Sequence, residues 1–193
     1  MNLPNKLTML RLILVPFYVF FLLMPSIPHH YLVALLIFAA ASYTDHLDGK
    51  MARKRNMITD FGKFADPLAD KILVLSALLC FVQLGWGDCV AVIIVLFREF
   101  SVTSIRLIAA SKGKVVAANI WGKVKTVTQM VAIIIIMVMR TAGDIVNMTM
   151  GAVPTTDTVI FIVSECLIWI STVFAVISGV IYIVQNWHFI AER

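Results

Sequence analysis

The chain has 193 residues, of which 61% are hydrophobic and 14% are charged, and its mean hydropathy is +0.94. A soluble domain of this length is usually about one quarter charged. The interior of a small globule cannot bury so many apolar side chains, which excludes an ordinary soluble protein. Because a membrane span takes about 20 mostly apolar residues, about six spans would use most of the chain. We therefore expect a single integral membrane domain over residues 1–193.

The net charge of +5 arises from 16 Lys and Arg residues against 11 Asp and Glu residues. In a membrane protein this excess predicts cytoplasmic loops and contact with anionic lipid headgroups. No basic run is interleaved with aromatic residues as a nucleic-acid groove requires, so we expect no nucleic-acid partner. The three cysteines lack metal-ligand spacing and are expected to be small apolar side chains.

Breaks in the apolar pattern divide the chain into six predicted membrane helices. Two prolines within 25–30 mark one break, and the polar segment 85–88 marks another. The N-terminal apolar stretch lacks a basic leader region, so we count it as a span. The predicted spans cover residues 7–24, 31–53, 67–84, 89–111, 119–139 and 158–187. The expected fold is an all-α, polytopic bundle of six transmembrane helices.

Basic residues gather at one set of predicted helix ends. The connections at 25–30 and 85–88 contain no Lys or Arg, and the connection at 140–157 contains only Arg140. By the positive-inside rule, both termini and the charged loops are expected in the cytoplasm. We therefore predict a multi-pass protein of the cell membrane with its active site on the cytoplasmic side.

Four aspartates stand at the cytoplasmic ends of the second and third predicted spans. Asp45 and Asp48 are three residues apart, and Asp66 and Asp70 are four apart. Each couple therefore shares one face of a helix. A short connection between the two spans folds them back as antiparallel neighbours, so the four carboxylates are expected to converge near the membrane surface.

Clustered carboxylates repel one another, and one or two divalent cations would relieve that repulsion. Ligation by oxygen alone suits Mg²⁺, Mn²⁺ or Ca²⁺ better than zinc, and an open Mg²⁺ site favours a phosphorylated ligand. Gly49 and Gly62 would let a ligand approach the backbone, and Arg53 could bridge a phosphate. The alternative, that the acids only solvate a loop, suits a single aspartate such as Asp60 better than two spaced couples.

Residues 45–70 carry the pattern D-x2-D-G-x2-A-R-x8-G-x3-D-x3-D, which resembles the signature of the CDP-alcohol phosphotransferase family at every fixed position. The resemblance implies a six-helix membrane enzyme, usually a homodimer, with two divalent cations, Mg²⁺ or Mn²⁺. Such enzymes transfer a phosphatidyl or similar group from a CDP-linked donor to an alcohol and release CMP. The residues implied are Asp45, Asp48, Asp66 and Asp70 for the cations, with Asp70 also the general base, and Gly49, Arg53 and Gly62 for CDP.

The first residues of the chain form a polar stripe of Asn5, Thr8 and Arg11, spaced three residues apart. This stripe predicts a short N-terminal interfacial helix. Beside the family resemblance, it suggests that Asn5 and Thr8 help to bind CDP. Anchoring at the membrane surface explains the stripe equally well.

The fourth and fifth predicted spans carry cations that suit an acceptor alcohol with its own phosphate. Arg98 and Glu99 lie within an apolar stretch, where charges are functional by default, although a structural pair is the alternative. Arg106 shares the face of Glu99, whereas Lys123 and Lys125 cannot both point along one helical face. We expect Arg106, Lys123 and Lys125 to bind the acceptor phosphate. Contact of the lysines with anionic headgroups is the alternative.

The segments that begin at Pro4, Arg98 and Gly122 resemble the branch of the family that uses glycerol 3-phosphate. This resemblance implies CDP-diacylglycerol as donor, sn-glycerol 3-phosphate as acceptor, phosphatidylglycerophosphate and CMP as products, and membrane lipids as surroundings. One alternative is the same chemistry with inositol phosphate or phosphatidylglycerol as acceptor. Another is a divalent-cation transporter, which would need polar groups through the membrane depth rather than acids crowded at one side.

Overall fold

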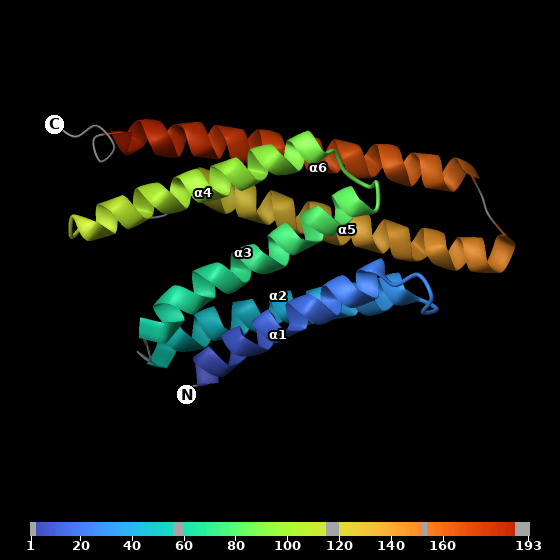
Figure 1. Ribbon diagram of the computed structural model, residues 1–193, viewed down its shortest axis with the longest axis horizontal. Coiled ribbons are helices and arrows are strands. Elements are labelled where there is room, and N and C mark those ends of the chain that lie inside the picture. Colours follow the sequence, from blue (N-terminus) through green and yellow to red (C-terminus); the bar gives the residue numbers. More distant parts are fainter. Residues whose placement is uncertain (1–2, 56–59, 115–119, 152–153, 188–193) are drawn as a thin grey trace. The chain divides into compact units, whose positions relative to one another are not determined.

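The computed structural model describes the backbone of residues 3–55, 60–114, 120–151 and 154–187. Its side chains are described for residues 5–44, 68–114, 120–149, 151 and 155–187. In these parts the chain is helical throughout apart from turns, which confirms the all-α prediction. The helices, shown in Figure 1, are α1 Leu3–Leu23, α2 His30–Arg55, α3 Asp60–Gln83, α4 Cys89–Ser111, α5 Ile120–Met150 and α6 Pro154–Gln185.

Three of the described helices are long and apolar enough to cross a membrane. The qualifying stretches are Asn5–Leu23 of α1, Ile120–Thr149 of α5 and Thr155–Gln185 of α6. The apolar part of α2, His30–Thr44, is shorter. Helix α4 carries three charges, those of Arg98, Glu99 and Arg106, which explains why length alone does not qualify it. The chain therefore has the helices of a membrane protein, and six crossings stay a prediction.

The helices form two compact units. The first unit comprises Met1–Leu84 and Met137–Ile160, and the second comprises Gly85–Ile136 and Phe161–Arg193. Helices α5 and α6 therefore contribute residues to both units.

In the first unit, α1 packs along both α2 and α3. The buried ring of Tyr18 on α1 lies 5.4 Å from the ring of Phe38 on α2, centroid to centroid. The Tyr18 hydroxyl donates to the sulfur of Met137 at 3.6 Å, which ties α5 to the same core. Aromatic and sulfur contacts of this kind hold helices together without placing charge in an apolar interior.

In the second unit, α4 lies beside α6 (Figure 1), and Val102 and Ile105 of α4 pack against Tyr182 and Ile183 of α6. The limits of α4 agree with the predicted span at 89–111 because both ends carry local signals. Asp88 caps the first turn by accepting from the Val90 amide at 2.7 Å. Just past the last turn, Gly113 adopts a φ of 72°, a backbone conformation that glycine reaches without strain.

The predicted end of the fifth helix is wrong. The fifth span was expected to end at residue 139, but α5 continues to Met150. Nothing between Arg140 and Met150 removes a helical hydrogen bond, and the turn comes only at Gly151, whose φ is 82°. Loss of apolar character therefore ends the expected span but not the helix.

The separate N-terminal interfacial helix is also absent from the described residues. Leu3–Leu23 is one continuous helix, and Asn5, Thr8 and Arg11 are buried in it rather than lying at a surface. The physical reason is that the polar stripe faces the neighbouring helices of the first unit. An ion pair to α3, described below, satisfies part of it.

Candidate functional site

Both predicted aspartate couples lie on helices. Asp45 and Asp48 belong to the last part of α2, and Asp66 and Asp70 belong to the first part of α3. On a helix, residues three or four positions apart lie on the same face, so each couple shares one face. The side chains of Asp45, Asp48, Arg53 and Asp66 lie outside the described residues, and so does the burial of Gly49 and Gly62.

Of the four predicted aspartates, Asp70 has a described side chain. Its carboxylate Oδ1 accepts a hydrogen bond from Arg11 Nη1, which makes an ion pair between α3 and α1. Arg11 is wholly buried, whereas the Asp70 side chain is 49% exposed. The guanidinium therefore holds one side of the carboxylate, and the exposed part of that carboxylate remains accessible to a ligand.

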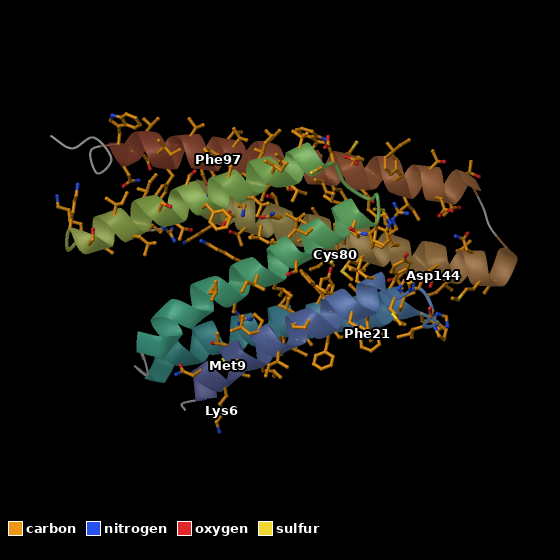
Figure 2. The ribbon with its side chains drawn as sticks, viewed as in Figure 1. Lys6, Met9, Phe21, Cys80, Phe97 and Asp144 are labelled. Atoms are coloured by element: carbon orange, nitrogen blue, oxygen red, sulfur yellow. The ribbon has the colours of Figure 1, made fainter. Side chains whose placement is uncertain are left out.

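The polar stripe of α1 lies on the face that carries this ion pair. Asn5 and Thr8 are both buried; Thr8 stands one three-residue step before Arg11 and Asn5 stands two. Lys6, between them in sequence, points away from the helix in Figure 2 and is exposed. Asn5 and Thr8 therefore point into the first unit, and their proposed contact with CDP remains a prediction.

The second unit holds a group of charges around Glu99. Arg98 Nη1 donates to Glu99 Oε1 at 2.8 Å, and Lys125 Nζ of α5 donates to the same oxygen. The side chains of Arg98, Glu99 and Lys125 are 11%, 11% and 6% exposed. Sharing one carboxylate lets two buried cations lie close together, because its negative charge offsets part of their repulsion.

The expected acceptor-binding cations take different positions within the second unit. Lys125 is buried against Glu99, whereas Lys123 is exposed. The prediction that at most one of the two points inward agrees with this. Arg106 is exposed, and its guanidinium lies 5.6 Å from the centre of the Tyr182 ring while Nε donates to the Tyr182 hydroxyl at 3.2 Å. The structure thus brings Lys125 to Glu99 and Arg106 to Tyr182.

The chemistry of the donor set fits a hard divalent cation, because the two couples supply only carboxylate oxygens, without sulfur or imidazole. Among the described side chains, no group of three or more His, Cys, Asp and Glu residues gathers in a way that holds a metal. Three of the four predicted ligands lie outside that description, so the cation site stays a prediction.

Known proteins resemble this chain over most of its length. The sequence profile of CDP-alcohol phosphatidyltransferases matches residues 1–181. The CDP-diacylglycerol–glycerol-3-phosphate 3-phosphatidyltransferase of Bacillus subtilis is 38% identical over 197 positions, which cover 96% of this chain and 95% of that protein. A protein of the same name from Rickettsia bellii is 32% identical over 94% of this chain and 93% of its own length. Another from Haemophilus influenzae is 41% identical over 68% of this chain and 73% of its own length. The chain belongs to the CDP-alcohol phosphatidyltransferase family.

Sequence reasoning missed the partners of several predicted site residues. The Arg11–Asp70 pair joins residues 59 positions apart, and the Arg106–Tyr182 contact joins residues 76 positions apart. Ser178 of α6, which accepts from Arg98 Nη2 at 2.6 Å, was also not anticipated. The one available signal was the small pair Ser178-Gly179 within a run of large apolar residues.

Replacing Glu99 by Gln is expected to destabilise the protein. The change leaves Arg98 and Lys125 buried without their shared negative charge, and breaking a buried pair in this way costs about 3 kcal/mol. Thermal unfolding of the purified protein in detergent measures the loss. The matched control is Glu165→Gln on α6, because Glu165 has no ion-pair partner among the described residues. Equal melting temperatures for the two variants would contradict a stabilising role for Glu99.

Proposed function

We propose that this chain transfers the phosphatidyl group of CDP-diacylglycerol to sn-glycerol 3-phosphate, producing phosphatidylglycerophosphate and CMP. The observation that carries the proposal is the Bacillus subtilis relative of that name, which matches nearly the whole of both chains. The aspartate pattern at 45–70 and its helical setting in α2 and α3 support the same chemistry.

In the proposed reaction, the acceptor hydroxyl attacks the β-phosphorus of the donor. A new phosphorus–oxygen bond forms there, and the bond to the oxygen shared with the α-phosphate breaks, so that oxygen leaves with CMP. Asp70 takes the proton of the attacking hydroxyl as the general base, which requires an accessible carboxylate. The half-exposed side chain of Asp70 suits this role, and Arg11 holds that carboxylate in place.

We propose that Asp45, Asp48, Asp66 and Asp70 hold two divalent cations, Mg²⁺ or Mn²⁺. Bound there, such cations neutralise pyrophosphate charge and stabilise the leaving oxygen. Asn5, Thr8, Gly49, Arg53 and Gly62 are proposed to line the CDP site. Support comes from the family's motif at these positions and, for Asn5 and Thr8, from their place on the α1 face that carries Arg11.

We propose that Arg106, Lys123 and Lys125 bind the phosphate of the acceptor. Three cations from neighbouring helices of one unit suit a doubly charged phosphate better than a neutral alcohol. Arg106 and Lys123 are exposed and therefore accessible, whereas Lys125 is held by Glu99. The proposed enzyme is a homodimer, which light scattering of the detergent-solubilised chain checks.

Replacing Asp70 by Asn is expected to lower the rate of acceptor-dependent CMP release by at least about 100-fold, because an amide cannot take the proton. The measurement is CMP release by the purified chain with CDP-diacylglycerol, sn-glycerol 3-phosphate and Mg²⁺. Asp157→Asn, at an exposed position in the first turn of α6, is the matched control and should keep the parent rate.

Arg106→Ala should chiefly raise the KM for glycerol 3-phosphate.

Several results of this assay would contradict the proposal. One is parent-like turnover by the Asp70→Asn variant, and another is CMP release that does not depend on the acceptor. Equal or faster turnover with inositol phosphate would assign a different acceptor. Flux of Mn²⁺ into liposomes without CDP-diacylglycerol would favour a transporter.

We propose that both termini and the catalytic side face the cytoplasm, which labelling with single cysteines tests. With Cys80, Cys89 and Cys166 replaced by Ala, Ser26→Cys should react with a membrane-impermeant maleimide on intact cells. Lys114→Cys should react only after the membrane is permeabilised, because the basic connection lies inside. The reverse pattern would overturn the proposed orientation.

A further inference from the structure

Arg98 of α4 occupies a notch on α6 formed by Ser178 and Gly179. Its Nη2 donates to the Ser178 hydroxyl at 2.6 Å, and Ser178 is 1% exposed. A Cβ atom added at Gly179 would lie 2.9 Å from Arg98 Cγ, closer than real contacts allow. The hydroxyl therefore fixes the tip of the arginine, and the missing side chain of Gly179 makes room for its stem.

Ser178 differs from Ser171 and Thr172, two other buried hydroxyl residues of the same helix. Ser171 and Thr172 each donate to the Ile168 carbonyl of their own helix at 2.8 Å. Such bonds satisfy a polar group locally and connect no other element. Ser178 instead accepts from a cation on α4, so its hydroxyl acts between helices.

Arg98 in turn is linked to Lys125 through Glu99. Both cations donate to the same carboxylate oxygen, Glu99 Oε1. A displacement of Arg98 therefore shifts the carboxylate that holds the Lys125 ammonium. The chain of contacts runs from α6 through α4 to α5 and lies wholly within the second unit.

We propose that the Ser178–Gly179 notch is a positioning element for acceptor binding: it fixes Arg98 and, through Glu99, the Lys125 ammonium. The inference rests on the proposed function, in which Lys125 binds the acceptor phosphate. Ser178 and Gly179 touch no substrate in this scheme and act through Arg98. Their loss should therefore weaken acceptor binding while leaving the chemical step and donor binding intact.

Ser178→Ala removes one oxygen and adds no atom, which makes it the sharpest test. Loss of a hydrogen bond to a charged group is expected to raise the KM for glycerol 3-phosphate about tenfold. The kcat and the KM for CDP-diacylglycerol should stay within about twofold of the parent values on the same reasoning. Ser171→Ala, one heptad earlier on α6 and equally buried, is the matched control and should change none of these constants.

A double-mutant cycle on Gly179 and Arg98 tests whether the missing side chain of Gly179 makes room for Arg98. Gly179→Ala should raise the KM for glycerol 3-phosphate in the parent chain, because its new Cβ displaces Arg98. The same change should have no further effect in an Arg98→Ala background, which lacks the Cγ atom that Gly179 accommodates. If Gly179→Ala does not fold, Ser178→Ala decides alone.

The outcomes separate this inference from the proposed function. A parent chain that releases no CMP with glycerol 3-phosphate overturns the proposed function. An active parent whose Ser178→Ala variant keeps its acceptor KM, or shifts it no more than Ser171→Ala does, overturns the positioning role alone. Effects of Gly179→Ala and Arg98→Ala that simply add would also overturn it.

Discussion

The need to compensate charge inside apolar helices organises both units of this chain. A charged side chain surrounded by hydrocarbon is costly unless a partner or a ligand offsets it. In the first unit, the buried guanidinium of Arg11 meets Asp70, which joins the beginning of α1 to α3. In the second unit, Glu99 is shared by Arg98 and Lys125, which joins α4 to α5. These ion pairs join helices within each unit.

Exposure divides these charges between structure and chemistry. Arg11 and Glu99 are buried and each pairs with another charged side chain, whereas the half-exposed Asp70 and the exposed Arg106 and Lys123 are accessible to the proposed substrates. Within the Arg11–Asp70 pair, one member is therefore buried and the other is accessible. This division explains how an apolar chain can keep accessible charges without losing its packing. It also fits a reaction whose substrates carry several phosphates and whose other substituents are acyl chains.

Local signals predicted much of this arrangement, and long-range contacts did not. The start of α4 was predicted from the polar segment 85–88, and the structure shows Asp88 of that segment capping the first turn. Helical geometry predicted that Lys123 and Lys125 would point to different sides, but which one is buried depends on Glu99, 26 residues from Lys125. The continuation of α5 past Arg140 was missed because a span was equated with its apolar part. The stripe that contains Arg11 was assigned to an interfacial helix because the partner of Arg11 on α3 is not visible in the sequence.

The most direct test of the account follows the β-phosphorus of the donor. CDP-diacylglycerol labelled with ³²P at that position is incubated with the purified chain, Mg²⁺ and either sn-glycerol 3-phosphate or plain glycerol. These two acceptors differ only in the phosphate that the cations of the second unit are proposed to bind. We predict that the label moves to a new lipid with glycerol 3-phosphate and stays in the donor with glycerol. Equal transfer to both acceptors, or label released in the nucleotide, would contradict the account.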